Sequence, residues 1–457
     1  MSIETEATDP TSAEATEELI PNGRFEKGAI GALPDGWRFF TPRENLAPKF
    51  ELTEQSGKRC LMASGEGNEH CLGILSTTIH LELGKTYYFR VIFHMSEGLN
   101  PHRNLLFHFF LENELNGIFE FRRVPNGCVE GSARIFLPGD GDGEAEIRIV
   151  FRHAGSKKVW IRSISLTECP PVPSRWVRVG CMRGKPDLDR CAAALDLAGE
   201  AGCDLFLLPE YMRGKYYQEP IDGDSAALMA KQAGRYRMYV SGGIVREEPR
   251  DGDVYNTALL FDREGRLAGS YDKVHPYSPE LQDSGVLPGR SVPVMETDFG
   301  ILGFIICYDS WFTDVTELLA LKGAEIILFP SAGFYRSLMP ARSADNCVRI
   351  VASSHNSGYG IWDTTGREVT NPESDPTVKP VHDISFRDVV ERETKGVGIL
   401  LASLDLSLSP TPAHNGGTMN SAPGGRRNRR EQQLYLDDAI CRERERWWTD
   451  ARPGKDA

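Results

Sequence analysis

One change of pattern along the chain constrains its fold more than any other feature. It falls at the proline-punctuated stretch CPPVPSRW, residues 169–176. Before it, 18–168 contains short runs rich in β-branched and aromatic residues, separated by turn clusters such as GDGDGE. After it, continuous apolar runs alternate with amphipathic stretches of helical period. Because 457 residues also exceed what one hydrophobic core usually serves, we predict two folded domains joined by a linker at 169–176.

The two domains are predicted to belong to different fold classes. Regularly spaced short strands over 18–168 favour an antiparallel β-sandwich. Strands that alternate with helices over 177–414 indicate an α/β domain, and their continuous apolar character implies a sheet covered on both faces. The acidic and polar residues 1–17 are expected to be a disordered leader. Residues 415–457 are expected to form a tail with a charged helix in RRNRREQQLYLDDAICRERERWW.

Charge and cysteine usage exclude several functional classes. With 52 basic and 65 acidic residues the formal net charge is −13, which argues against nucleic acid or an anionic membrane as the main partner. No apolar run approaches the roughly 20 residues of a membrane-spanning helix, and the first residues lack the pattern of a secretory signal. The ten cysteines include no CxxC pair and no zinc-ligand spacing. We therefore expect reduced thiols, no bound metal and a cytoplasmic protein.

Three reactive side chains stand where buried strands are predicted to end. Glu210 closes DLFLLPE, Lys273 closes GSYDK and Cys307 closes GILGFIIC. In α/β sheets the carboxyl ends of strands form the ligand-binding edge, so these distant residues can meet there. A carboxylate can take the proton of a thiol, and a nearby ammonium favours the thiolate and stabilises an oxyanion. Taken singly, each residue also fits a structural interpretation: a core cysteine, an acid at a helix start and a solvated lysine.

Segments that contain these residues resemble the nitrilase, or carbon–nitrogen hydrolase, superfamily. The resemblance covers about 176–408 and includes, in order, DLFLLPE, GGIVREEPRDGDVYNTALLFDREGRL, YDKVHPY, GFIICYDSWFTDVTELLALKGAEIILFPSAG, GIWDTTGREV and GILLASLDLS. It implies a four-layer αββα sandwich, a thiol mechanism without a cofactor, and a homodimer or larger homo-oligomer. Position by position, the resemblance makes Glu210 the base, Lys273 the oxyanion stabiliser and Cys307 the nucleophile.

The resemblance also bears on a fourth site residue and on the substrate. The second glutamate of the family is best matched by Glu280, with Asp283 as a weaker competitor. The sequence departs from the family at Thr313-Asp314, where Pro-Glu is common, and at Asp345, where a glutamate is common. Both departures concern the substrate more than the chemistry.

The motif CYDSW resembles the amidase and carbamoylase branches more than true nitrilases. The expected reaction is hydrolysis of a small-molecule amide or N-carbamoyl group through a cysteine thioester, with release of ammonia or an amine. Acyl transfer on the same scaffold, nitrile hydrolysis, and a binding function of the N-terminal domain are the alternatives. Tyr216, Tyr308, Trp311 and Phe334 are candidate substrate-lining residues, although each fits a packing position equally well.

The N-terminal region has a resemblance of its own, to galactose-binding-like or carbohydrate-binding jelly rolls. It rests on IPNGRFEKG, LPDGW and the last strand, VWIRSISLTE. The NG at 22–23 and the PDG at 34–36 are turn sequences. The resemblance implies a jelly roll that binds a glycan or docks a protein. Trp37 is expected to be a core aromatic rather than a platform for a sugar.

Overall fold

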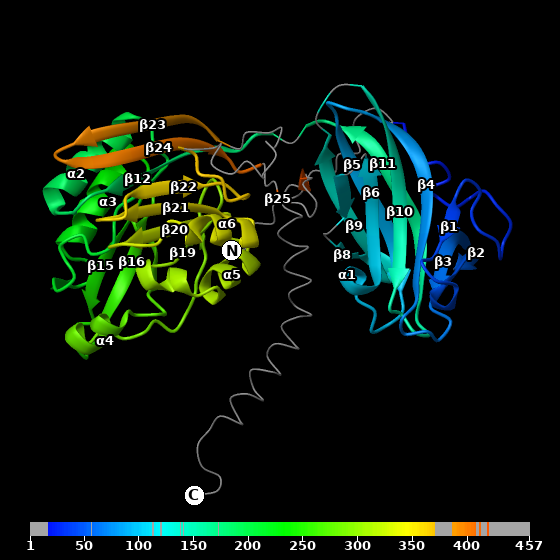
Figure 1. Ribbon diagram of the computed structural model, residues 1–457, viewed down its shortest axis with the longest axis horizontal. Coiled ribbons are helices and arrows are strands. Elements are labelled where there is room, and N and C mark those ends of the chain that lie inside the picture. Colours follow the sequence, from blue (N-terminus) through cyan, green and yellow to red (C-terminus); the bar gives the residue numbers. More distant parts are fainter. Residues whose placement is uncertain are drawn as a thin grey trace, which may run out of the picture. The chain divides into compact units, whose positions relative to one another are not determined.

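The protein divides into two compact units. The computed structural model describes residues 17–370, except 56, 112–113, 119–120, 138, 140 and 172, and also 386–407, 411–412 and 418–419. The units are Met1–Val172 and Pro173–Thr418, drawn in Figure 1 in blue to cyan and in green to orange. The predicted leader 1–17 and tail 415–457 lie almost wholly outside the described residues. Within the described part, no helix has both the length and the apolar character needed to cross a membrane.

The first unit is an antiparallel β-sandwich of two sheets, which agrees with the predicted class. One sheet has the order β1-β4-β10-β6-β7 and the other has the order β2-β3-β11-β5-β9-β8. A short helix, α1 (Pro101–Asn104), precedes β6. The strands are β1 (Arg38–Phe40), β2 (Lys49–Gln55), β3 (Lys58–Ser64), β4 (Leu72–Glu82), β5 (Thr86–Met95), β6 (Leu105–Leu111), β7 (Glu114–Ile118), β8 (Phe121–Val124), β9 (Cys128–Phe136), β10 (Asp142–Arg152) and β11 (Lys158–Cys169).

Alternate side chains of both sheets meet in one apolar core, because successive residues of a strand point to opposite faces. Trp37 belongs to this core: it is 5% exposed, and its ring centroid lies 5.8 Å from that of Phe25. Its Nε1 donates to the carbonyl oxygen of Pro21 at 3.2 Å. The expectation that Trp37 is a core aromatic is confirmed. Other core members include Phe89, Val91, Phe93, Ile147, Ile149, Phe151, Ile161 and Leu166.

The second unit is of the α/β class, as its alternating pattern predicts. Its strands form two sheets, β17-β16-β15-β13-β12-β24-β23 with β14 beside β15, and β18-β19-β20-β21-β22. In the described residues the sheets join through one bridge, Arg183 to Ser354. The strands are β12 (Trp176–Arg183), β13 (Leu205–Leu207), β14 (Gln218–Glu219), β15 (Tyr239–Glu247), β16 (Val254–Phe261), β17 (Leu267–Asp272), β18 (Met295–Glu296), β19 (Ile301–Phe304), β20 (Ile326–Ser331), β21 (Arg349–Ser354), β22 (Tyr359–Trp362), β23 (Phe386–Thr394) and β24 (Val397–Asp405). The helices are α2 (Leu188–Glu200), α3 (Asp224–Tyr236), α4 (Ser278–Ser284), α5 (Asp314–Leu321) and α6 (Leu338–Asn346).

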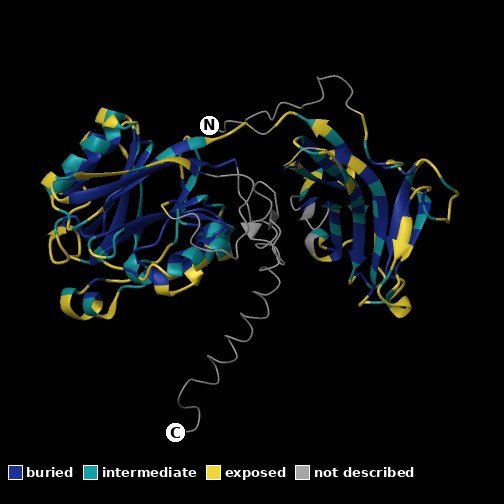
Figure 2. Cartoon of the chain, turned by 45° about the horizontal axis from the view of Figure 1, so that its top comes forward, coloured by how far each residue is buried: buried dark blue, intermediate teal, exposed yellow. Residues whose placement is uncertain are grey.

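The sheets of this unit pack face to face and carry helices on their outer faces. On β13, Leu205 and Leu207 lie in the core between the sheets, whereas Phe206 packs among residues of α2 and α3. On the other sheet, Leu319 of α5 packs beside Gly303 of β19. Figure 2 shows the strands buried between helices whose outer surfaces are partly exposed. The order of layers is therefore helix, sheet, sheet, helix.

Strand directions place three strand ends at one edge of this unit. Strands β12, β13 and β15 are parallel to one another, as are β19, β20 and β21. The bridge between β12 and β21 is also parallel. Two antiparallel pairings separate β17 from β15, so these two strands point the same way. The carboxyl ends of β13, β17 and β19 therefore share one edge, where α/β sheets usually carry their ligand sites.

Candidate active site

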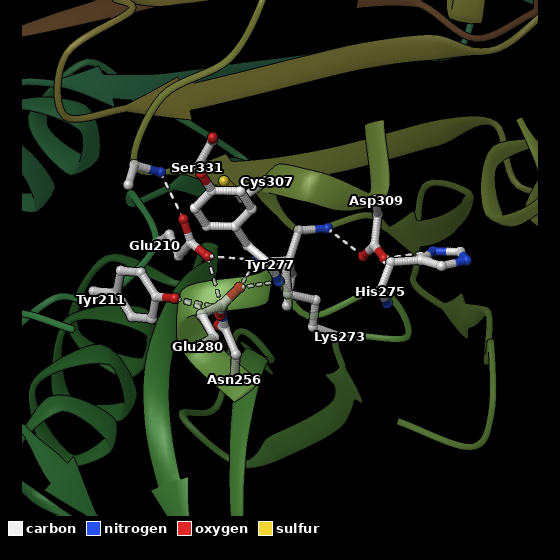
Figure 3. A network of polar contacts seen from close by, with 12 residues as sticks. Glu210, Tyr211, Asn256, Lys273, His275, Tyr277, Glu280, Cys307, Asp309 and Ser331 are labelled. Carbon is white, nitrogen blue, oxygen red and sulfur yellow. Dashed lines mark hydrogen bonds and ion pairs between the residues drawn. The ribbon is translucent and has the colours of Figure 1, made fainter. Parts of the chain in front are cut away.

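The predicted reactive side chains converge at this edge. Glu210 lies shortly after β13, Lys273 comes directly after β17, and Cys307 begins the 3₁₀ turn η4 (Cys307–Trp311) after β19. Figure 3 shows them around Glu280, which α4 contributes. The structure thus brings together all four residues that the sequence singled out.

Glu210 is completely buried, and donors satisfy both of its carboxylate oxygens. Its Oε2 accepts from the backbone N–H of Ala332 at 2.6 Å. Its Oε1 accepts from Asn256 Nδ2 at 2.6 Å and from Lys273 Nζ at 3.3 Å. A Cβ at Gly243 of β15 would lie 2.8 Å from the Cα of Glu210, so the close approach of the two backbones requires glycine there. The carboxylate is therefore fixed in direction as well as buried.

Lys273 is 1% exposed and lies between two carboxylates. Its Nζ donates to Glu280 Oε2 at 2.7 Å and to Glu210 Oε1 at 3.3 Å. Burial by itself disfavours the ammonium, but the negative charges of Glu210, the Cys307 thiolate and Glu280 outweigh burial and raise the pKa of Lys273. The side chain is therefore a permanent cation at neutral pH.

Glu280 receives four hydrogen bonds. Besides Lys273, its donors are the backbone N–H of Tyr277 at 2.6 Å, the hydroxyl of Tyr211 at 2.5 Å and Asn256 Nδ2 at 2.7 Å. Burial favours the neutral acid, but the charge of Lys273 and these donors outweigh it and lower the pKa of Glu280. Glu280 therefore stays ionised and does not readily accept a proton.

Cys307 stands on a strained turn. Its φ of 45° lies in the left-handed region, which favours glycine, so the backbone turns sharply between β19 and η4. Its Sγ lies 3.7 Å from the carbonyl oxygen of Gly333. Burial, and next the charge of Glu210, raise the pKa of the thiol to about 11, while Lys273 and Ser331 act in the opposite direction. At neutral pH the resting group is a thiol, and a base must take its proton before it can attack.

A buried carboxylate ties the lysine segment to the cysteine turn. Asp309, in η4, is completely buried and accepts from the backbone N–H of His275 at 2.9 Å and from the hydroxyl of Tyr271 at 2.8 Å. It also accepts from the backbone N–H of Ile306 at 2.9 Å. The ring of His275 lies 3.1 Å from Asp309, and this contact raises the pKa of His275. Asp309 thus fixes the approach of Lys273 to Cys307 (Figure 3).

Two further residues complete the network, and the sequence interpretation assigned no role to them. Asn256, on β16, donates to both carboxylates and contacts the hydroxyl of Tyr211 at 3.1 Å. Tyr211 follows Glu210 with a φ of 55°, and its pKa is raised by burial and by the charges of Glu210 and Glu280. Its hydroxyl therefore keeps its proton and acts as a donor. A polar residue inside the apolar run VYNTALLFD was the one available signal for Asn256.

Comparison with known proteins places this geometry in a family. Residues 177–367 match the carbon-nitrogen hydrolase family. The chain is 30% identical over 201 residues to the omega-amidase NIT2 of Xenopus tropicalis, across 38% of this chain and 72% of that protein. The chain belongs to the carbon–nitrogen hydrolase family. It is an amidase-like hydrolase of the nitrilase superfamily, which confirms the enzyme class predicted from the sequence.

Other relatives of this hydrolase cover similar shares of the chain. The hydrolase C26A3.11 of Schizosaccharomyces pombe is 25% identical over 257 residues, which is 48% of this chain and 80% of that protein. Among solved structures, Nit3 of Saccharomyces cerevisiae aligns with a TM-score of 0.42 and 21% identity, covering 52% of this chain and 93% of that one. An amidase from Nesterenkonia sp. aligns with a TM-score of 0.40 and 22% identity, covering 51% and 92%.

The predicted substrate-lining residues of the hydrolase are found in different surroundings. Phe334 is 9% exposed and packs against Phe329 and Trp362 at ring-centroid distances of 5.1 and 6.3 Å, which is a packing position. Trp311 is 51% exposed and Tyr308 partly so, with centroids 6.2 Å apart. These two residues belong to the same turn as Cys307.

Three other residues from the sequence interpretation lie on the surface of the hydrolase. Tyr216 is 62% exposed, with the ammonium of Lys215 over its ring. Asp283 is exposed, whereas its neighbour Glu280 is buried in the network. Asp314, at the first departure from the family pattern, lies 3.5 Å from the ring of His275. Among the described residues, no three His, Cys, Asp or Glu side chains are grouped so that they could hold a metal.

Proposed function

We propose that this hydrolase cleaves the C–N bond of a small, non-peptide amide or N-carbamoyl compound through a Cys307 thioester. One observation carries the proposal: a thiol, a buried carboxylate and a buried ammonium meet at the edge where strands β13, β17 and β19 end. The thiol holds its proton at neutral pH, and Glu210 is the carboxylate whose charge acts on it most strongly. An amide substrate is favoured because relatives of this chain are named omega-amidases.

In the first half of the reaction, Glu210 takes the proton of Cys307 while Sγ bonds to the substrate carbonyl carbon. The π electrons of the carbonyl move to its oxygen, and the oxyanion is stabilised by the ammonium of Lys273 and by the backbone N–H of Tyr308. When the carbonyl re-forms, the C–N bond breaks. The proton held by Glu210 passes to the leaving nitrogen, so ammonia or an amine departs neutral and a thioester remains.

In the second half, water replaces the thiol. Glu210 takes a proton from a water molecule, whose oxygen bonds to the thioester carbon, and Lys273 again stabilises the oxyanion. Collapse breaks the C–S bond, and the proton on Glu210 returns to Cys307. The products are a carboxylic or carbamic acid and the restored thiol. Glu210 thus titrates in both halves.

Glu280 has a different role in this proposal. Its lowered pKa and four donors keep it ionised throughout the cycle. Its charge holds Lys273 protonated at 2.7 Å, so the cation is in place before the oxyanion forms. Glu280 is therefore assigned as the group that positions Lys273 rather than as a second base.

The nucleophile can be tested by intact mass. A panel of amides, carbamoyl compounds and nitriles is mixed with the protein, and an adduct on Cys307 with release of ammonia or amine is expected for at least one amide. The Cys307→Ala variant should form no adduct and release no ammonia. Cys169→Ala, which removes a partly buried thiol of the β-sandwich, is the matched control and should behave as wild type. Full activity of Cys307→Ala would falsify the assignment.

Acyl transfer on the same scaffold is distinguished by the second half-reaction. Once an adduct is found, the trapped thioester is offered water alone or water with candidate amines. Formation of the free acid at the same rate in both supports hydrolysis. Acceleration by an amine, with an amide as product, identifies an acyltransferase. Turnover of a nitrile but of no amide would place the chemistry with nitrile hydrolysis instead.

We further propose that the N-terminal sandwich is a galactose-binding-like jelly roll that binds a glycan. The supporting observation is an aromatic pair on its outer face: His94 and Trp160 are paired across β5 and β11, with ring centroids 5.9 Å apart. Both lie on the face opposite to core residues Phe93 and Ile161. Nδ1 of His94 is buried and has no hydrogen-bond partner among the described residues. Glycan-array binding by the full chain that Trp160→Ala abolishes is expected; no binding to any glycan would sink the idea.

A further inference from the structure

Asn256 is the one side chain that touches both carboxylates of the site and carries no charge. It is completely buried on β16, between β15 and β17. Its Nδ2 lies 2.6 Å from Glu210 Oε1 and 2.7 Å from Glu280 Oε1. Figure 3 shows the amide below the two carboxylates, with Lys273 on their other side.

Two carboxylates that share a neighbour at these distances have a physical problem. Like charges in a buried site raise one of the two pKa values, and the pair then holds one proton between its oxygens at neutral pH. A proton held in this way would occupy the base before the thiol could deliver its own. Lys273 reduces the repulsion, but its two contacts are unequal, at 2.7 Å to Glu280 and 3.3 Å to Glu210.

The primary amide of Asn256 is suited to this problem. An NH₂ group carries two hydrogens that diverge in one plane, so each carboxylate can receive one of them. A hydrogen bond to the charged form of an acid favours that form. An amide adds no charge, whereas an aspartate at the same position would add a third anion. Asn256 Oδ1 points away from both acids and has no hydrogen-bond partner among the described residues.

We propose that Asn256 is a positioning residue that gives each carboxylate its own hydrogen and prevents the two from sharing a proton, so that Glu210 remains free to act as the base. The inference rests on the proposed function of Glu210. It assigns the side chain only, because the backbone carbonyl of Asn256 accepts from Lys273 N–H at 2.8 Å and is kept in any variant.

The test compares Asn256→Ala and Asn256→Asp with Tyr255→Phe. Tyr255 is the preceding residue of the same strand, and its hydroxyl reaches Asp253, outside the site, so it is the matched control. The pH dependence of kcat/KM for an amide substrate is measured for each. In both Asn256 variants the acid limb should move to higher pH by about one unit or more, because a shared proton must first be lost. At pH 7 kcat should fall by about 10- to 100-fold and recover at alkaline pH, with little change in KM.

A second measurement does not depend on activity. Infrared difference spectroscopy detects the carbonyl stretch of a protonated carboxylic acid. At pH 7 this band should appear in Asn256→Ala and be absent from wild type and from Tyr255→Phe. If Asn256→Asp does not fold, the alanine variant decides, because it leaves no third acid.

Two results separate this inference from the proposed function. If Cys307→Ala keeps its activity, the proposed function fails. If Cys307→Ala is inactive but the Asn256 variants keep the wild-type pH limb and show no protonated acid, only the role of Asn256 is overturned. A loss of kcat that is the same at every pH would likewise overturn it, since that pattern reports a structural defect.

Discussion

Each unit of the protein buries an acid with basic partners, but the charge balance is opposite in the two. In the β-sandwich, Glu130 is 3% exposed and receives the guanidinium groups of Arg90 at 2.5 Å and Arg122 at 2.7 Å. In the α/β unit, Glu210 and Glu280 share the single ammonium of Lys273. One acid therefore has two cations, whereas elsewhere two acids have one cation.

The solvent access of the cations differs as well. The side chains of Arg90 and Arg122 are 42% and 70% exposed, whereas that of Lys273 is 1% exposed. An acid with an excess of cations near water is held ionised and has no tendency to take a proton. A buried group of two acids and one cation carries an excess negative charge that a proton neutralises. The same residue types thus build a structural contact in one unit and a base in the other.

The largest expected effect comes from removing the excess charge of the site. Glu210→Gln should lower kcat/KM by about 100- to 10,000-fold, the usual range for loss of a general base. The charge of Glu210 is one cause of the raised Cys307 pKa, so its removal should lower the pH at which iodoacetamide alkylates Cys307. Mass spectrometry across pH measures this midpoint. Glu264→Gln, a change on the surface, should leave both quantities at wild-type values; an unchanged midpoint in Glu210→Gln would contradict the coupling.

Lys273→Met removes the cation and leaves two buried acids. We expect kcat/KM to fall by about 100- to 1,000-fold, as for loss of an oxyanion donor. We also expect the free energy of unfolding to fall by about 3–5 kcal/mol, because a buried charge group loses its partner. Urea unfolding and ammonia release measure the two effects. Lys322→Met, at an exposed lysine of the same unit, serves as the control. Unchanged stability in Lys273→Met would mean that the acids take up protons instead.

Acidification should distinguish the two clusters less strongly. The pKa values of Glu280 and Glu130 are both lowered from 4.5 in the folded protein. Each therefore stabilises the fold above pH 4.5, and this stabilisation is lost as the pH falls through the lowered value. Glu280→Gln and Glu130→Gln should each flatten the decline of unfolding free energy below pH 4.5. A decline as steep as in wild type, in urea titrations at several pH values, would show that neither acid contributes.

The smallest effect is expected on the sandwich side. Arg122→Ala removes one of two cations from Glu130, and its side chain is 70% exposed. Because Arg90 remains, the loss of unfolding free energy should be less than about 1 kcal/mol. The kcat/KM of the hydrolase should not change. A measurable loss of activity would link the sandwich to catalysis, which the comparison of the two clusters does not predict.

The sequence predicted the main site residues because each closes an apolar strand. Glu210, Lys273 and Cys307 follow this rule, and strand direction alone brings their strand ends to one edge. Glu280 was identified through the family resemblance, because it lies on a short helix in a loop and no periodic pattern marks it. Fold class was likewise predictable from the change in pattern at 169–176.

Residues whose role depends on tertiary approach were not predictable. Asn256 lies inside a strand, and only the arrival of two acids from other elements gives its amide a function. Asp309 was visible in CYDSW, but its hydrogen bond to His275 N–H depends on how the lysine segment meets the turn. Phe334 follows the motif FPSAG, and only the packed position of Trp362 shows that its ring belongs to the core. The return of β24 to pair with β12 is equally hidden, because nearly the whole unit separates them in sequence.

The left-handed backbone at Cys307 sets the demands of chemistry against those of the chain. Glycine adopts a φ of 45° with less strain than cysteine does, so at this position the residue needed for turnover is not the residue the turn prefers. Selection for activity keeps a less comfortable residue there. Once that selection is relaxed, a single replacement by glycine would remove the nucleophile without a penalty to the turn. Inactive descendants of such an enzyme can therefore persist as well-folded proteins, available for other uses.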